Sequence, residues 1–256
     1  MKPKRALTKT SHRIIAFLAT STAALLTVAV PAVAQDISIN LNEGTGITER
    51  AIQIIALITV LSLAPSILVM VTSFTRIVVV LSLLRTAMGV QQSPPNAVII
   101  SLALFLSAFV MAPVFTKAYN DGITPLVNNE IELTEAFDRA SLPFHAFMMD
   151  HVREKDLTMF VDLAKVETPE KPDAVPLTVL VPAFMISELR RAFEIGFLLF
   201  VPFIVIDMVV ASVLMSMGMM MLPPIIISLP FKLVFFVLVD GWALVTGSLI
   251  KSFTGG

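Results

Sequence analysis

Hydrophobic and polar positions divide the chain into long apolar segments separated by polar ones. Four of the apolar segments have the length of about 20 residues that a helix needs to cross a bilayer. They are residues 51–71, 97–115, 195–217 and 225–250. Between the second and the third lies a polar segment, residues 117–173, in which apolar residues recur at helical spacing. The pattern predicts an all-α protein with about four long apolar helices and a helical loop between the two pairs.

The beginning of the chain has the pattern of a secretory signal peptide. Five basic residues and no acidic one precede an apolar segment, residues 14–30. The sequence "PAVAQ" follows, and its small residues predict cleavage after Ala34. An uncleaved first transmembrane helix is the alternative interpretation.

Cleavage would place the mature N-terminus outside the cytoplasm, and two crossings would return the chain to the same side. The polar segment then lies outside as well. The predicted division is listed in chain order: signal peptide 1–34, extracytoplasmic lead-in 35–50, first apolar hairpin 51–116, acidic extracytoplasmic loop 117–175 and second apolar hairpin 176–256.

Composition supports a membrane protein. Hydrophobic residues make up 56% of the 256 residues, charged residues only 14%, and the mean hydropathy is +0.88. In water such a chain would expose large apolar patches. There is no cysteine, which excludes disulfides and thiolate metal sites. Residues 117–173 contain 12 acidic and 6 basic residues, so this segment has the whole net charge of −6 that the mature chain would have.

Charged residues within or between the apolar segments of the last third are candidates for pairing between helices or subunits, because an intramembrane charge costs several kcal/mol unless it has a partner or a watery path. They are Glu188, Arg190, Arg191, Glu194, Asp207, Lys232 and Asp240. Helical spacing predicts Arg190–Glu194 and Glu188–Arg191 pairs. Lys232 has no opposite charge within four positions, so a Glu188–Lys232 contact is predicted, within the chain or between copies. Snorkelling or simple helix pinning is the alternative.

The stretch "MSMGMMMLPP" concentrates five methionines before a proline pair. Pro223 and Pro224 predict a turn between two apolar helices, and Gly218 loosens the approach to it. The methionines of the tip are Met219, Met220 and Met221. Because methionine is flexible and polarizable, three of them repeated around a ring would form an adaptable apolar constriction. Filling of a core, or a thioether site for Cu(I), are the alternatives.

Enzyme chemistry has little support in the sequence. His145 and His151 flank Asp150, but six residues apart they fall on different sides of a helix. Nucleotide-binding, nucleophile-elbow and zinc-protease motifs are absent from the sequence. Asp207 or Asp240 could relay protons, although structural pairing explains them more simply. No cofactor, metal or nucleic-acid partner is expected.

Four stretches in order carry a family resemblance: "SFTRIVVVLSLLR" with "QQSPPN", "PAFMISELRRAFEIGF", "DMVVASVLMSMGMMMLPP" and "SLPFKLVFFVLVDGW". Together they resemble the FliP family of flagellar biosynthetic proteins, which includes related subunits of virulence type III secretion systems. The resemblance runs from about residue 51 to the end, apart from the acidic loop. Arg190 stands where the family more often has lysine, so the charge is kept. The signal peptide favours the flagellar branch.

The resemblance implies a core subunit of the flagellar protein export gate in the inner membrane, within the basal body. Several copies would form a pentamer-like ring with FliQ and FliR, next to FlhB, and unfolded flagellar proteins would pass through it. The helices would be bent hairpins in a helical cone, partly above the bilayer plane, and Pro65, Pro182, Pro202 and Pro230 fit such bends. The methionine tip would act as the gasket of the pore. A virulence gate subunit, or a small-solute or ion transporter, are the alternatives; transporters commonly contain internal repeats, which this sequence lacks.

Overall fold

A computed structural model describes residues 47–90, 93–165, 174–219 and 222–255. The predicted signal peptide, the cleavage site after Ala34 and most of the lead-in lie outside the described residues. The chain divides into two compact units, Met1–Ile58 and Thr59–Gly256. The first unit contributes only the beginning of one helix to the described residues, and the remaining helices belong to the second.

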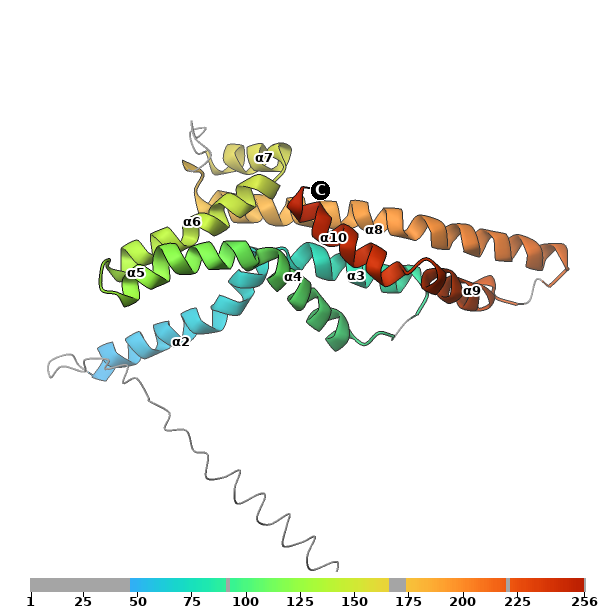
Figure 1. Ribbon diagram of the computed structural model, residues 1–256, viewed down its shortest axis with the longest axis horizontal. Coiled ribbons are helices and arrows are strands. Elements are labelled where there is room, and N and C mark those ends of the chain that lie inside the picture. Colours follow the sequence, from blue (N-terminus) through green and yellow to red (C-terminus); the bar gives the residue numbers. More distant parts are fainter. Residues whose placement is uncertain (1–46, 91–92, 166–173, 220–221, 256) are drawn as a thin grey trace, which may run out of the picture. The chain divides into compact units, whose positions relative to one another are not determined.

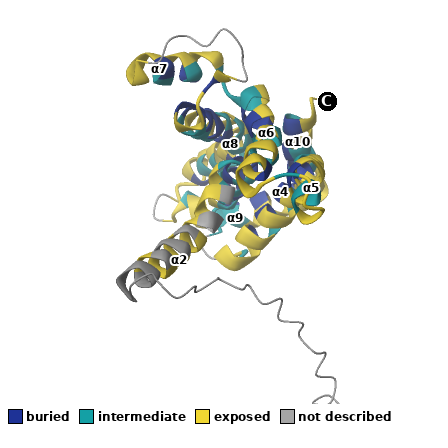
Figure 2. Ribbon diagram, turned by 90° about the vertical axis from the view of Figure 1, so that its left-hand side faces the viewer, coloured by how far each residue is buried: buried dark blue, intermediate teal, exposed yellow. Residues whose placement is uncertain are grey.

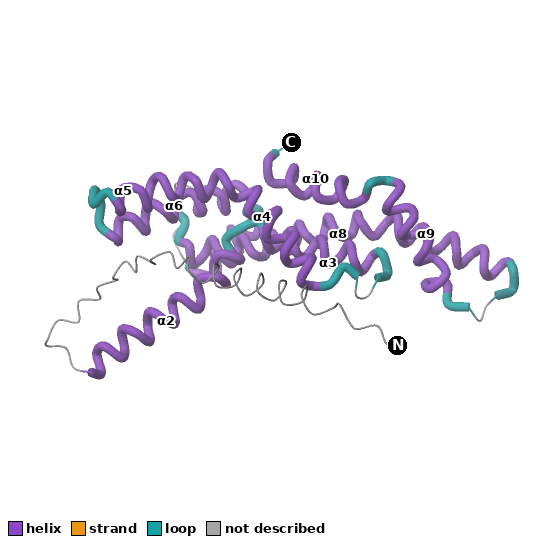
Figure 3. The backbone as a smooth tube through the Cα atoms, turned by 60° about the horizontal axis from the view of Figure 1, so that its bottom comes forward, coloured by secondary structure: helices purple, strands orange, loops and turns teal. Residues whose placement is uncertain are grey.

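Every regular element in the described ranges is helical (Figure 3), which confirms the predicted all-α class. The elements follow one another as α2 (Ile47–Met70), α3 (Phe74–Ala87), α4 (Asn96–Ala118), the π-helix η1 (Tyr119–Ile123), α5 (Thr124–Val127), α6 (Leu133–His151), α7 (Glu154–Ala164), α8 (Leu177–Ser216), α9 (Pro224–Leu238) and α10 (Gly241–Thr254).

The core of the second unit forms where α3 packs along the first half of α8, with α4, α6 and α10 against them. Figure 2 shows the buried residues gathered between these helices and the exposed ones on their outer surfaces. Ile77, Leu84, Leu180 and Phe184 are fully buried there. Burying such a side chain stabilises the fold by about 1.5–3 kcal/mol relative to leaving it in water, so this junction holds the helices together.

The acidic segment is helical, as its periodicity predicts: η1, α5, α6 and α7 all fall within it. Gly122 of η1 lies so close to α6 that an added Cβ would stand 2.6 Å from the Cβ of Ala140. Only glycine allows η1 to pack this closely against α6. At the start of α7, Glu154 and Asp156 place negative charge beside the free N–H groups of the first turn.

α8 is one uninterrupted helix of 40 residues (Figure 1). The charged segment 187–194, which the hydropathy pattern separates from the following apolar segment, lies inside it. Pro182 and Pro202 also lie inside α8, and Pro230 lies inside α9. None of these three prolines ends its helix. That they bend the helices, as the resemblance implies, stays a prediction.

The last apolar segment, predicted as one helix, is broken between α9 and α10, whose axes differ by 63°. Asp240 at the break has φ +50, a left-handed conformation that ends α9 and starts α10. Among the described residues, two helical stretches are long and apolar enough to cross a membrane, Asn96–Val127 and Leu177–Ser216. The bent pair α9–α10 makes a third if it counts as one span. The first predicted apolar segment forms most of α2, a helix of 24 residues.

Candidate functional site

The turn between α8 and α9 is built by glycine and proline, as the sequence predicts. α8 ends at Ser216, and Gly218 follows with φ +75. The Met219 N–H donates to Leu214 O at 3.0 Å and the Gly218 N–H donates to Met215 O at 3.0 Å. This pair of hydrogen bonds is a Schellman motif, which satisfies the last carbonyl groups of the helix.

The other side of the turn begins with the proline pair. Pro223 precedes α9 in an extended conformation, and Pro224 is its first residue, a position where the missing N–H costs nothing. Met219 between the two helices is 43% exposed. Met220 and Met221 lie outside the described residues. The tip is thus a short turn with at least one methionine open to its surroundings.

Below the tip, an ion pair joins the two helices of the hairpin. Lys232 Nζ of α9 lies 2.7 Å from Asp207 Oδ2 of α8. The Ser228 hydroxyl donates to the other carboxylate oxygen of Asp207, and Lys232 Nζ donates to Ala87 O at 3.3 Å. Lys232 is 4% exposed. The ammonium therefore ties the hairpin to the C-terminal end of α3, where carbonyl oxygens favour positive charge.

A second ion pair lies in the core. Arg76 of α3 donates from Nε to Glu188 Oε2 of α8 at 2.9 Å, and its Nη2 pairs with the other carboxylate oxygen. Both side chains are buried, with 1% and 0% of their area exposed. Burial lowers the pKa of Arg76, and its hydrogen bond to Glu188 opposes that change. Arginine keeps its charge in proteins, so the contact is a bidentate charge pair.

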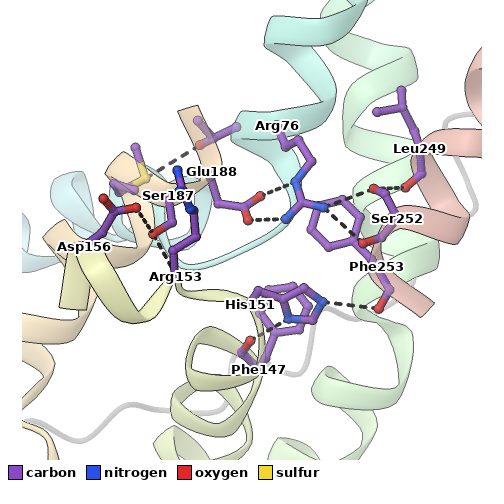
Figure 4. A network of polar contacts seen from close by, with 12 residues as sticks. Arg76, Phe147, His151, Arg153, Asp156, Ser187, Glu188, Leu249, Ser252 and Phe253 are labelled. Atoms are coloured by element: carbon purple, nitrogen blue, oxygen red, sulfur yellow. Dashed lines mark hydrogen bonds and ion pairs between the residues drawn. The ribbon is translucent and has the colours of Figure 1, made fainter. Parts of the chain in front are cut away.

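The C-terminal helix completes the surroundings of Arg76 (Figure 4). Arg76 Nη1 donates to the carbonyl oxygen of Ser252 at 3.2 Å and to its hydroxyl at 3.0 Å. The ring of Phe253 lies 3.7 Å from the guanidinium carbon, a cation–π contact. His151 of α6 contacts the carbonyl oxygens of Phe147 and Phe253, at 2.8 and 3.2 Å. Segments from the beginning, middle and end of the second unit therefore meet at one guanidinium.

The predicted charge pairs have mixed outcomes. The Arg190–Glu194 pair is confirmed, with Nε 3.1 Å from Oε1. The Glu188–Lys232 contact is wrong within the chain, because Glu188 pairs with Arg76 and Lys232 with Asp207. For the same reason Glu188 does not pair with Arg191.

Two other charged candidates have no partner in this part of the chain. Among the described residues, neither Arg191 nor Asp240 makes an ion pair. Asp240 is exposed at the α9–α10 bend. The structure shows Asp240 only as the residue whose left-handed backbone conformation separates α9 from α10.

The sequence interpretation missed Arg76 as a member of a pair. Arg76 and Glu188 are 112 residues apart, so spacing within one helix says nothing about them. The sequence signal that could have found this pair is Arg76 itself, because it stands next to a strongly apolar segment. An arginine that is buried there needs a carboxylate partner. Ser187 was missed too; its hydroxyl donates to Asp156 Oδ2 at 2.8 Å and accepts from the Arg153 N–H, which joins α7 to α8.

The histidines occupy separate places. His145 is buried, with Nε2 2.8 Å from Val175 O. His151 packs between the rings of Phe147 and Phe253. In the part of the chain that the structure describes, no three His, Cys, Asp or Glu side chains are grouped as a metal site. The arrangement supports helix anchoring.

These features define a class: an all-α protein with helices of membrane-spanning length, pinned to one another by buried ion pairs. The FliP family model matches residues 57–249, and the chain belongs to the FliP family. Three curated relatives, each named flagellar biosynthetic protein FliP, support this. That of Caulobacter vibrioides is 63% identical over 95% of this chain and 91% of its own length. Those of Bacillus subtilis and Rhizobium meliloti are 56% and 55% identical over 79% of this chain, and 91% and 83% of their own lengths.

Proposed function

We propose that this chain is a core subunit of the flagellar type III protein export gate, located in the inner membrane at the flagellar basal body. Membership of the FliP family supports a component of the flagellar export apparatus, a structural or transport subunit and not an enzyme. The long apolar helices α4 and α8 support a membrane location. The flagellar names of the relatives favour this branch over a virulence gate.

In this proposal several copies form a pentamer-like ring with FliQ and FliR, next to FlhB. The large apolar surface of α8 and α9 supports such an assembly. Val205, Val209, Ile226 and Leu238 are among the apolar side chains exposed on these two helices. A contiguous apolar surface of this kind needs lipid or protein to cover it, and copies of one chain around a ring would each cover part of the next.

The tip of the hairpin would form the seal of the pore. The observation that supports this most is the combination of a fixed hairpin with an open tip: Asp207 and Lys232 hold the helices, while Met219 stays exposed beyond them. Flexible thioether side chains converging from several copies would exclude water and ions by dewetting. They would also adapt to an unfolded polypeptide of any sequence. A test of the seal separates a conducting gate from a purely structural subunit.

Deletion of the gene in the source bacterium is the first experiment. The export proposal predicts that hook and filament proteins disappear from the medium and that motility is lost, and that the intact gene restores both. Normal filaments in the deletion strain would overturn the flagellar proposal, and secretion of virulence-type substrates would then be measured in its place.

The seal is tested by changing Met219, Met220 and Met221 together to alanine in the restored strain. We expect export to persist and the membrane to leak ions, because alanine leaves the constriction wider. Dye measurements of membrane potential would report the leak. Met208→Ala, which removes an exposed methionine from the middle of α8, is the matched control and should leave the potential unchanged. An ion-tight triple variant would rule out the gasket.

A further inference from the structure

A pocket rich in arginine lies where α3, α7, the first half of α8 and α10 approach one another. It encloses about 410 Å³, which is within the range of about 300–1,000 Å³ of small-molecule sites. Its lining residues are Arg76, Arg153, Arg191, Glu194, Ile195 and Ser252. Figure 4 shows the side of it formed by Arg76, Arg153 and Ser252. Guanidinium groups repel one another, so three of them around one pocket need groups that compensate their charge.

Two of the three arginines have side-chain N–H donors without a hydrogen-bond partner among the described residues. Nη1 of Arg153 is buried without a hydrogen-bond partner among the described residues. The side chain of Arg191 is half-buried and makes no hydrogen bond or ion pair within the same ranges. Arg76 differs, since Glu188 and Ser252 satisfy it. Buried donors without partners are rare in folded proteins and often mark an ion or ligand.

The charges that line the pocket do not balance. Glu188 outside the lining pairs with Arg76 and also interacts electrostatically with Arg191. The only carboxylate in the lining is that of Glu194, whose Oε1 lies 3.9 Å from Arg153 Nη1 and 3.1 Å from Nε of Arg190, outside the pocket. One shared carboxylate thus faces the two remaining arginines of the lining. The surplus is positive, and the group that fits it is an oxyanion, which guanidinium donors bind in a fork geometry.

The surface next to the pocket is apolar. Phe193, Phe197 and Leu198 on α8 are exposed within about a turn of Glu194. From residue 195 to its end at Ser216, α8 measures about 33 Å at 1.5 Å per residue, close to the roughly 30 Å of a bilayer core. If this half of the helix crosses the hydrocarbon, Arg153 and Arg191 stand at the level of the headgroups.

We propose that this pocket binds a phosphate oxyanion, supplied by the headgroup of an anionic phospholipid whose acyl chains lie along the exposed apolar face of α8. Arg153 and Arg191 donate to the phosphate oxygens, and Phe197 and Leu198 contact the chains. Basic pockets beside membrane helices recognise anionic lipids in this way. The site is separate from the methionine tip, so a failure of the lipid-binding proposal would not count against the proposed pore, and the reverse also holds.

The experiment compares lipids on the purified full chain in neutral detergent. Short-chain phosphatidylglycerol, short-chain phosphatidylcholine and inorganic phosphate are titrated separately, and the thermal unfolding midpoint gives an apparent affinity. Native mass spectrometry counts the lipids that remain bound. The variants are Arg191→Gln, Arg153→Gln/Arg191→Gln, and the control Arg139→Gln. Arg139 of α6 is exposed, pairs with Glu135, and does not line the pocket.

Phosphatidylglycerol should raise the midpoint of the wild type and of Arg139→Gln, with phosphatidylcholine much weaker. The double variant should bind it at least about tenfold more weakly, because the phosphate loses its charge-assisted hydrogen bonds to both guanidinium groups. Arg191→Gln should fall between, and it guards against a double variant that fails to fold.

Other outcomes identify the source or refute the site. If inorganic phosphate gives the same shift with the same dependence on Arg153 and Arg191, the oxyanion site stands and its ligand is soluble phosphate. If phosphatidylglycerol and phosphatidylcholine act alike, or if the folded variants bind as the wild type does, the proposal is overturned.

Discussion

The two halves of α8 have similar apolar sequences and opposite surroundings. In the first half, Leu180, Ala183, Phe184 and Ala192 are fully buried by α3, α6 and α7. In the second half, beyond Gly196, only Phe203 and Leu214 are buried, and α9 is its main neighbour. The same helix is thus a core element at one end and an uncovered surface at the other.

The difference teaches that apolar composition alone does not locate a core. Both halves of α8 are rich in apolar residues, yet the chain covers mainly the half that includes the charged segment 187–194. The half that is richest in uninterrupted apolar sequence is left for lipid or for other subunits. Truncation of apolar side chains of α8 should therefore destabilise the isolated chain in the first half and act on assembly in the second.

Loss of the buried carboxylate should have the largest effect on stability. Glu188→Leu leaves the charge of Arg76 uncompensated in the core, and we expect a loss of about 3–5 kcal/mol in the free energy of unfolding. Denaturant titration in detergent measures it. Arg76→Leu/Glu188→Leu, which removes both charges, should recover most of the loss. The control Glu194→Leu removes a carboxylate that is mostly exposed, and equal losses for Glu188→Leu and Glu194→Leu would contradict the comparison.

A matched pair of leucines tests the two halves directly. Leu180→Ala removes a fully buried side chain and should lower the free energy of unfolding by about 2–5 kcal/mol, from lost burial and the cavity it leaves. Leu198→Ala removes one that is 68% exposed and should stay within about 0.5 kcal/mol in the isolated chain. The same denaturant titration reports both. Similar losses at the two positions would mean that the second half is covered after all.

The hairpin pair should matter less than the core pair. Lys232→Met leaves Asp207 without its ammonium but with the hydrogen bond from Ser228, and Asp207 is 31% exposed. We expect a loss of about 1.5–3 kcal/mol, the range for a hydrogen bond to a charged group. Asp207→Asn/Lys232→Met should be milder than Lys232→Met alone. A loss larger than that of Glu188→Leu would reverse the ranking of the two sites.

The end of α8 should give the smallest change. Gly218→Ala places a Cβ in open space, so the only cost is the left-handed backbone, about 1–2 kcal/mol. Gly247→Ala in α10 also meets open space but has ordinary helical geometry, and should stabilise by about 0.5–1 kcal/mol. Thermal unfolding of both variants checks the opposite signs. Two shifts of the same sign would show that the turn tolerates other conformations.

Periodicity and turn residues predict the local structure well. The helical nature of the chain, the helices of the acidic segment and the turn near Gly218 and Pro224 all follow from neighbouring residues, and so does the Arg190–Glu194 pair. The resemblance of four stretches predicts the family, which the family model confirms.

Contacts between distant residues could not be predicted in the same way. The partners of Glu188 and Lys232 depend on which helices pack together, and the two side chains offer many acceptable partners of opposite charge. The break at Asp240 was missed because the prolines are the stronger local signal. Aspartate adopts the left-handed conformation less readily than glycine, so the residue type at position 240 is a weak signal of a break. The close packing of the Phe236 ring on Gly241, where an added Cβ would lie 2.2 Å from the ring, could not be predicted from spacing either.

The cage around Arg76 has a consequence for the order of synthesis. Arg76 leaves the ribosome 176 residues before Ser252, its last hydrogen-bond partner. At about 5–20 residues per second, that interval is roughly 9–35 seconds. During it the guanidinium lacks Ser252 and the ring of Phe253, and until residue 188 has been made it lacks the carboxylate of Glu188 as well. The contacts between α3 and α10 can therefore form only after nearly the whole chain has been made. On a ribosome stalled within α10, Arg76 would still lack its contacts with Ser252 and Phe253.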